Sequence, residues 1–175
     1  KKKDAMTDVF LGTDYHSHLG TKSAGLAAYD IELGIQRKIH NIGNSLFRSK
    51  FEKIFETMRG TSAIGSINDS DPQPLLVRSK LGVYAIIFTG AINNAKELID
   101  MYIEKTGGQF GSQTNGAVNT TELVSALINQ KETIEEGIAY AQDLIDGTVS
   151  LLILRDNGNV VAARDKMGKL PIHIG

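Results

Sequence analysis

The chain closes with the stretch that decides its fold: Ser150-Leu-Leu-Ile-Leu154 and, after a short turn, Ala162-Ala-Arg-Asp-Lys-Met-Gly-Lys-Leu-Pro-Ile-His-Ile-Gly175. Apolar residues flank the turn Asp156-Asn-Gly-Asn159, whose Asn-Gly pair adopts positive φ at little cost. The pattern predicts a two-stranded hairpin that closes the domain. An Ala-Ala-Arg-Asp-x-x-Gly-x-x-Pro run follows directly after its second strand.

Length and composition indicate one domain with a full hydrophobic core. Of the 175 residues, 41% are hydrophobic and 22% are charged. The net charge of −1 gives no reason to expect a nucleic-acid partner. No apolar run approaches the roughly 20 residues that a membrane span needs. The absence of cysteine excludes a disulfide framework, thiolate metal ligands and a Cys nucleophile within these residues. We expect a cytosolic location, by elimination, and no cofactor.

The first 68 residues show alternating helix and strand signals. Asp4 is placed to cap a helix through Thr13, with Met6, Val9 and Phe10 inward. Residues 24–29 and 35–39 are expected to form a strand pair, and residues 63–68 a further strand. Between them, apolar residues recur at helical spacing and predict an amphipathic helix, with Phe47, Phe51, Ile54, Phe55 and Met58 on its inner face.

The remainder of the chain repeats the alternation. Residues 75–77 and 83–88 are predicted strands, the second buried on both faces. Asn94 and Glu97 have capping-box spacing, as do Asn119 and Glu122, so a helix is expected after each pair. A further helix is predicted over 134–145, and the glycine-rich residues 106–116 are expected to form a loop. Antiparallel strand groups separated by helices favour an α+β fold of two stacked sheets with helices outside.

Five ordered blocks resemble the class II glutamine amidotransferases, in particular the glutaminase domain of amidophosphoribosyltransferases. His18-Leu-Gly-Thr-Lys-Ser-Ala-Gly25 is similar to that family's His-Arg-Gly-x-x-Ser-Ala-Gly. Phe88-Thr-Gly-Ala-Ile-Asn-Asn-Ala-Lys-Glu-Leu98 is similar to His-Asn-Gly-x-Leu-x-Asn-x-x-Glu-Leu. The other three blocks are residues 65–75, Asn119-Thr-Thr-Glu-Leu123 and the C-terminal hairpin. The resemblance implies a four-layer α/β/β/α sandwich over residues 1–175, the N-terminal-nucleophile hydrolase fold.

The resemblance also implies a mechanism. In this family an N-terminal Cys attacks the carboxamide of glutamine, and ammonia passes to a second active site. Register through the His18 block places the family's first strand, with its leading Cys, upstream of Lys1. We therefore expect a domain without its first strand and a nucleophile outside these residues. A phosphoribosyltransferase-like domain after the chain is implied as well, and so is a homo-oligomer. The expected partners are a small amide or amine donor and a synthase domain, either linked or separate.

Several site residues of the family are changed here. Gly90 matches the oxyanion glycine, but Thr89 replaces the neighbouring Asn. Asn68 stands where an Arg pairs with the glutamine carboxylate, and Thr120 where an Asp pairs with its amine; Asp69 also lies in this glutamine-contacting block. Losing two charge-assisted hydrogen bonds, at roughly 1.5–3 kcal/mol each, implies much weaker glutamine binding.

Alternatives remain open at several positions. A non-catalytic regulatory or assembly module would keep this fold without turnover. A metal-dependent hydrolase would use Asp14, His16 and His18, which point to one face if the segment is an extended strand; a capped helix end is the alternative. Arg164 and Asp165 are expected to form a local ion pair before Gly168.

Overall fold

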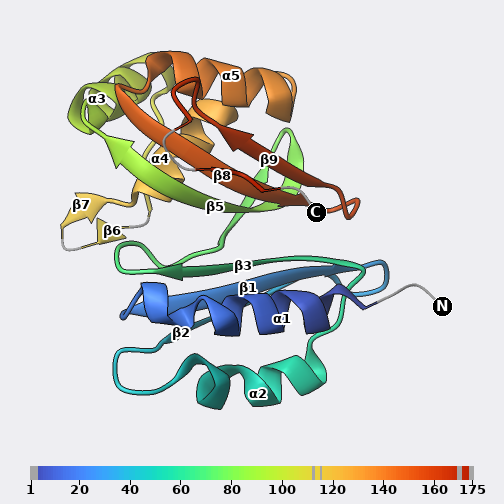
Figure 1. The fold of residues 1–175 in the computed structure, drawn as a ribbon. Coiled ribbons are helices and arrows are strands. Elements are labelled where there is room, and N and C mark those ends of the chain that lie inside the picture. Colours follow the sequence, from blue (N-terminus) through green and yellow to red (C-terminus); the bar gives the residue numbers. More distant parts are fainter. Residues whose placement is uncertain (1–3, 112, 115, 169–170, 174–175) are drawn as a thin grey trace.

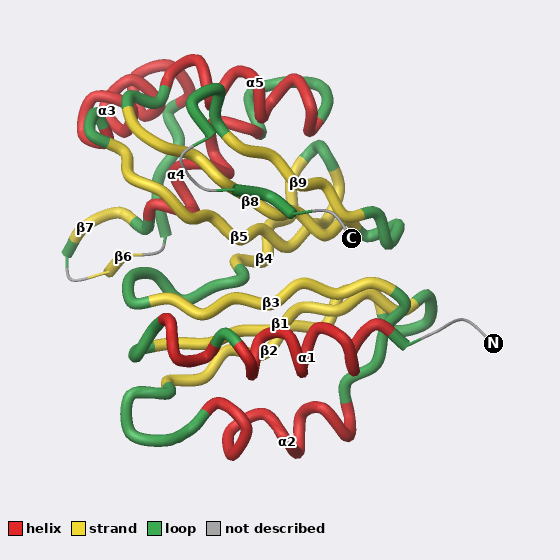
Figure 2. The backbone as a smooth tube through the Cα atoms, in the orientation of Figure 1, coloured by secondary structure: helices red, strands yellow, loops and turns green. Residues whose placement is uncertain are grey.

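The computed structural model describes residues 4–111, 113–114, 116–168 and 171–173 and shows four layers (Figure 1). Two antiparallel sheets face each other, and helices cover the outer face of each (Figure 2). The strand orders are β2-β1-β3 in one sheet and β4-β5-β8-β9 in the other. The predicted sandwich of two antiparallel sheets with outer helices is confirmed.

The N-terminal half of the sandwich, residues 4–68, contains the three-stranded sheet. Its elements are α1 (Ala5–Tyr15), β1 (Ser23–Asp30), β2 (Gly34–Asn41), α2 (Phe47–Thr57) and β3 (Ser62–Asn68). Helix α1 starts where predicted, because the Asp4 carboxylate accepts a hydrogen bond from the Met6 N–H at 3.0 Å. Both helices cover the outer face of β1, and their shared core is formed by Met6, Phe10, Ala24, Leu26, Ala28, Phe47 and Phe51.

The C-terminal half, residues 75–164, contains the four-stranded sheet. Its elements are β4 (Leu75–Ser79), β5 (Gly82–Ile92), α3 (Ala95–Thr106), α4 (Thr120–Ile128), α5 (Ile134–Leu144), β8 (Gly147–Arg155) and β9 (Val160–Arg164). Strand β5 pairs with β4 and β8, and residues 84–88 are buried on both faces, as predicted. The β8–β9 hairpin is confirmed, and so is the Asn119 cap, which accepts from the Glu122 N–H at 3.0 Å.

A thin apolar layer joins the two sheets. Ala27 and Ile64 from the N-terminal half pack against Ala85, Ile87 and Leu154 from the C-terminal half. These five side chains close the space between the sheets at this point, and Ile87 also borders the inter-sheet cavity.

Two local predictions are wrong. The Asn94 side chain makes no cap bond to α3; it donates to the Leu144 carbonyl at 2.9 Å and accepts from the Asp146 N–H at 3.0 Å. Tertiary bonds to the α5–β8 junction have replaced the local cap. The segment 106–116, expected to be a loop, contains the short strand β6 (Gln113–Thr114), which pairs with β7 (Ala117–Val118). Residues 112 and 115 of this segment lie outside the described residues. Within the described ranges, none of the helices has the length and apolar character to cross a membrane.

Candidate functional site

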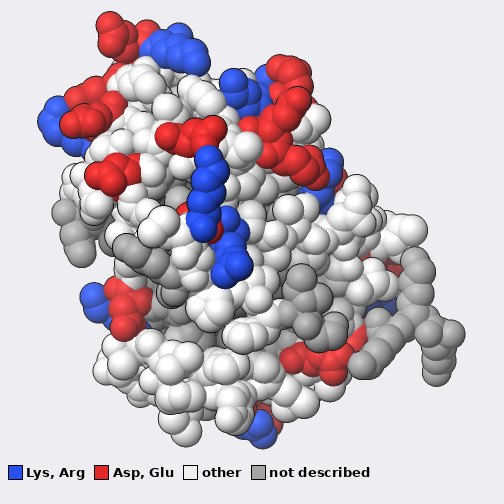
Figure 3. Space-filling model, turned by 45° about the horizontal axis from the view of Figure 1, so that its top comes forward, with Lys and Arg blue, Asp and Glu red and all other residues white. Residues whose placement is uncertain are grey.

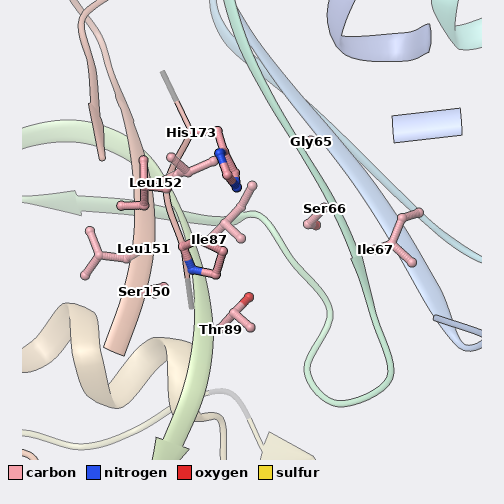
Figure 4. A pocket seen from close by; sticks show the side chains of 11 residues that line it. Gly65, Ser66, Ile67, Ile87, Thr89, Ser150, Leu151, Leu152 and His173 are labelled. Carbon is pink, nitrogen blue, oxygen red and sulfur yellow. The ribbon is translucent and has the colours of Figure 1, made fainter. Parts of the chain in front are cut away.

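A cavity of about 460 Å³ opens between the two sheets. Its wall comes from three strands and the segment after β9: Gly65, Ser66, Ile67, Ile87, Thr89, Ser150, Leu151, Leu152, Pro171, Ile172 and His173. In Figure 4, the side chains of Thr89 and His173 extend toward the gap that separates them from β3. The remaining lining is mainly aliphatic, so the cavity combines an apolar body with a few hydrogen-bonding groups.

One of the two predicted oxyanion positions borders this cavity. Thr89 is part of its wall, and Gly90 follows it on β5; both residues are exposed. A Cβ at Gly90 would lie 1.9 Å from the Thr148 carbonyl oxygen, so the close approach of β8 by itself requires glycine here. The role of Thr89 and Gly90 in holding an oxyanion stays a prediction.

The three predicted substrate-contact positions, Asn68, Asp69 and Thr120, do not form one group: Asn68 and Thr120 both bond to Asp71, whereas Asp69 bonds to the segment before β1. Asn68 ends β3, donates to the Asp71 carbonyl at 2.6 Å and accepts from the Ser70 N–H. Asp69 instead anchors the segment before β1: its carboxylate accepts from the N–H groups of Thr21 at 2.5 Å and Lys22 at 2.9 Å. These bonds, Thr21 first, hold the pKa of Asp69 below its ordinary value.

Asp71 connects Asn68 with Thr120. Its carboxylate, only 4% exposed, accepts from the Thr120 N–H at 2.8 Å and from the Thr120 hydroxyl at 2.5 Å. The end of β3 is thereby tied to the first turn of α4. Sequence reasoning assigned Asp71 to a turn or a pocket edge; a buried carboxylate at a helix N-terminus could be found only from the fold.

Gln73 is a second buried residue that sequence reasoning did not single out. Its side-chain amide accepts from the Phe88 N–H at 2.7 Å and donates to the Phe88 carbonyl at 2.9 Å, as a neighbouring strand would. The Ser66 hydroxyl donates to the Gln73 carbonyl. Gln73 therefore joins the two sheets and holds the residue just before Thr89. The sequence signal that pointed to Gln73 was the Gln73-Pro74 pair in the block of residues 65–75.

The proposed metal-ligand cluster does not form. The extended strand on which the metal-hydrolase alternative depended is absent, because α1 continues through Tyr15 and residues 17–19 form a 3₁₀ turn. Asp14 pairs with Arg48 at 2.6 Å, and the His18 imidazole hydrogen-bonds to the Tyr15 carbonyl. Among the described residues, no group of three His, Asp or Glu side chains could hold a metal ion. The alternative of a capped helix end fits the structure.

The expected Arg164–Asp165 ion pair is also wrong. The Asp165 carboxylate accepts from the Val149 N–H at 3.0 Å and the Gly168 N–H at 2.9 Å. These main-chain donors, Val149 first, lower the pKa of Asp165. The guanidinium of Arg164 lies instead against Gly168, where an added Cβ would be 2.6 Å from Nη1. Asp165 still orders the turn, but through the backbone.

Comparison with known proteins establishes the class. The glutamine amidotransferase domain family matches residues 46–175, so the chain belongs to that family. It is a class II domain related to the glutaminase domain of amidophosphoribosyltransferase, which confirms the resemblance seen in the sequence. The last block of that resemblance includes residues 169–170 and 174–175, which lie outside the described residues.

Particular relatives agree with this class. The amidophosphoribosyltransferase of Archaeoglobus fulgidus is 28% identical over 172 residues, covering 90% of this chain and 35% of the relative. The amidophosphoribosyltransferase of Methanocaldococcus jannaschii is 29% identical over 180 residues, covering 95% of this chain and 36% of the relative. The chain thus spans about a third of the length of these relatives.

Solved structures match the fold. Glutamine phosphoribosylpyrophosphate amidotransferase from B. subtilis, solved with ADP and GMP, superimposes with a TM-score of 0.77 at 23% identity, covering 93% of this chain and 35% of that one. A structure described as the allosteric regulatory enzyme of purine biosynthesis gives a TM-score of 0.69 at 24% identity, covering 85% and 32%. At these identities the likeness concerns the fold.

Proposed function

We propose that this domain is an amidotransferase glutaminase unit that holds an amide or amine donor in the inter-sheet cavity and supplies ammonia to a synthase or transferase domain. Its nucleophile comes from outside these 175 residues. The observation that carries the proposal is the position of Thr89, in the wall of a cavity that faces β3 across the gap, with Gly90 directly after it on β5.

The free edge of β3 supports the place of the nucleophile. Within the described residues, β3 pairs with β1 alone. Gly65 and Ile67 line both the inter-sheet cavity and a second hollow of about 240 Å³ beside α1, which Gly12, Thr13, His16 and Leu19 complete. A sheet edge flanked by two hollows suits one more strand, since its N–H and C=O groups need partners. A strand there would place its residues beside the cavity.

The chemistry of the unit follows from acyl transfer. The nucleophile adds to the carboxamide carbon, the C–N bond breaks, and the nitrogen leaves as ammonia after taking a proton. Water then hydrolyses the acyl-enzyme. The Gly90 N–H and the Thr89 hydroxyl are the groups near the cavity mouth that suit the oxyanion. Asn68 and Thr120 stand where the family has ionic contacts to glutamine. Both are neutral, both bond to Asp71, and neither is among the residues that line the cavity, so we expect ordinary glutamine to bind weakly.

The surface gives no support to a nucleic-acid role. On the face shown in Figure 3, lysine and arginine side chains alternate with aspartate and glutamate, and no continuous basic stripe crosses it. With a net charge of −1, the chain as a whole does not attract a polyanion.

An ammonia-release assay on the full-length protein tests the proposal. Glutamine, asparagine and simple primary amides serve as donors, and the mature N-terminal residue is determined by mass spectrometry. We expect a Cys, Ser or Thr upstream of Lys1 and ammonia release from at least one amide. Release should fall about tenfold or more in Thr89→Val, because one oxyanion donor is lost. The control Thr57→Val, exposed on α2, should keep the wild-type rate. An upstream segment that lacks all three nucleophiles would end the proposal.

A non-catalytic module is the second candidate, favoured by the replacement of both ionic glutamine contacts. It predicts no ammonia release from any amide, while the partner synthase domain still uses free ammonia. Isothermal titration separates the two candidates further. Millimolar or tighter binding of glutamine would count against the non-catalytic module.

A further inference from the structure

The polar groups of the inter-sheet cavity are neutral hydroxyls and one imidazole. Ser66, Thr89 and Ser150 supply the hydroxyls, and His173 supplies the ring. None of the described lining residues is an Asp, Glu, Lys or Arg. Arg164 faces Ser150 across the β8–β9 pair, but its guanidinium packs against Gly168 and is not part of the wall.

Ser150 is the unusual member of this set. Its Oγ is buried and has no hydrogen-bond partner in the part of the chain that the structure describes. An unsatisfied buried hydroxyl is costly, and native structures contain few of them, so each one calls for an explanation. Ser150 lies in the wall of an open cavity. A bound molecule in this cavity would supply the missing partner once the hydroxyl rotates toward it.

Thr89 places a second hydroxyl beside it. The two residues are direct partners in the antiparallel β5–β8 register. Directly opposed side chains have Cβ atoms about 5 Å apart and point to the same face of the sheet. Ile87 and Leu152 are the next opposed pair on this face, and both line the cavity. A pair of hydroxyls thus adjoins an aliphatic surface.

We infer that this cavity binds an uncharged carboxamide, with Thr89 and Ser150 as its hydrogen-bond partners and Ile87 and Leu152 against its aliphatic part. A carboxamide offers two N–H donors and one carbonyl acceptor, and each hydroxyl both donates and accepts. Among the described lining residues, none is an acid that would pair with the ammonium group of a zwitterion such as glutamine, and the His173 imidazole is the one ring that a carboxylate would meet, so charge against this wall is poorly compensated. The inference rests on the proposed function, since it names the donor class of the same cavity.

The test compares propionamide with propionate, which have nearly the same shape and differ in charge. Each is titrated into the full-length protein and followed by backbone ¹⁵N–¹H chemical shifts, with L-glutamine as a third ligand. We expect propionamide to shift the signals of residues 87–89 and 150–152 and to saturate in the millimolar range, as suits a very small ligand. Propionate and glutamine should bind at least about tenfold more weakly, because the described wall has no Lys, Arg, Asp or Glu to pair with their charges.

Variants test the named contacts. Ser150→Ala and Thr89→Val should each weaken propionamide binding about three- to tenfold, the effect of one neutral hydrogen bond. Ser49→Ala, on α2 and away from the cavity, should leave binding unchanged. Equal or tighter binding of propionate or glutamine, no saturable propionamide shift, or wild-type affinity in both cavity variants would overturn the inference.

The outcome is separable from that of the ammonia assay. Propionamide binding at these residues without ammonia release from any amide would end the proposed function and leave the inference in place. Ammonia release from glutamine without propionamide binding would support the proposed function and overturn the inference.

Discussion

The two halves of the sandwich are built from the same layers, yet they differ in the number of strands that are paired on both sides. In the C-terminal half, β5 and β8 each have a strand on both sides. In the N-terminal half only β1 does, and β3 borders two hollows in the described structure. The comparison shows where this fold keeps room for a ligand. The open edge of one sheet and the hydroxyl-bearing face of the other share a single cavity.

Their cores differ in chemistry as well. The N-terminal half depends on aromatic packing, with the rings of Phe47 and Phe51 stacked at 4.5 Å and Phe10 tilted beside Phe47 at 5.5 Å. In the C-terminal half, aliphatic side chains from β5, β8, α4 and α5 predominate. A few large rings can cover a small sheet, and for that reason each ring contributes a large share of the stability of its half.

The largest expected effect is in the aromatic core. Phe51→Ala removes a fully buried ring and should lower the free energy of unfolding by about 3–5 kcal/mol. Urea denaturation measures the loss. Leu46→Ala, at a side chain that is 81% exposed, should change stability by less than about 0.5 kcal/mol. Equal effects of the two substitutions would show that the aromatic cluster does not hold this half together.

The junction between the halves comes next. A Cβ at Gly25 would lie 1.8 Å from the Gln73 carbonyl oxygen and 2.7 Å from the Pro74 ring. Gly25→Ala should therefore cost about 2–3 kcal/mol by overpacking, measured by thermal unfolding. It should also speed hydrogen exchange at the Phe88 amide, which the Gln73 side chain protects.

Gly12→Ala is the matched control for Gly25→Ala. An added Cβ meets no atom within 4 Å there, and the residue lies inside α1. Alanine should stabilise this helix by about 0.5–1 kcal/mol. A stabilising Gly25→Ala would contradict the close contact between β1 and the segment that follows β3.

A smaller effect is expected at the start of α4. Asn119→Ala removes the acceptor of the Glu122 N–H and should cost about 1 kcal/mol, read from the urea midpoint. Asn119→Ser, which keeps a capping oxygen, should stay within a few tenths of a kcal/mol of wild type. If the two variants lose the same stability, the cap is not what orders this end of the helix.

The smallest expected effect is a pH dependence shared by the two halves. Because main-chain donors lower the pKa of Asp165 below 3.8, its stabilising effect is present above that pH and is lost as the pH falls through the lower, folded-state pKa. The melting temperature of Asp165→Asn should differ most from wild type at neutral pH, and the gap should close in acid. Asp69→Asn should behave in the same way, since the pKa of Asp69 is also lowered. A gap that widens in acid would contradict both assignments.

Helix and strand positions followed well from sequence, because each depends on local periodicity and on turn residues. The Asn157-Gly158 turn, the Asp4 cap and the aromatic stripe of α2 are examples. Asn94 shows the limit of this reasoning: its spacing to Glu97 predicts a cap, yet its amide bonds to the α5–β8 junction, some fifty residues further along the chain. The segment with Asp14, His16 and His18 shows another limit, since α1 extends two residues beyond the predicted end at Thr13 and a 3₁₀ turn follows it.

By itself, the order of apolar and turn residues determined the layers of this protein, and the five motif blocks indicated its family and implied the positions where ionic glutamine contacts are replaced. Only the tertiary structure decided which neutral groups meet in the cavity. Ser150 and Thr89 are about sixty residues apart and become neighbours through the β5–β8 register. Asp71 and Gln73 lie in the block of residues 65–75, and only the packing of the two sheets shows that they are buried. Strand pairing and burial depend on contacts between residues far apart in the chain, so the local sequence does not specify either of them.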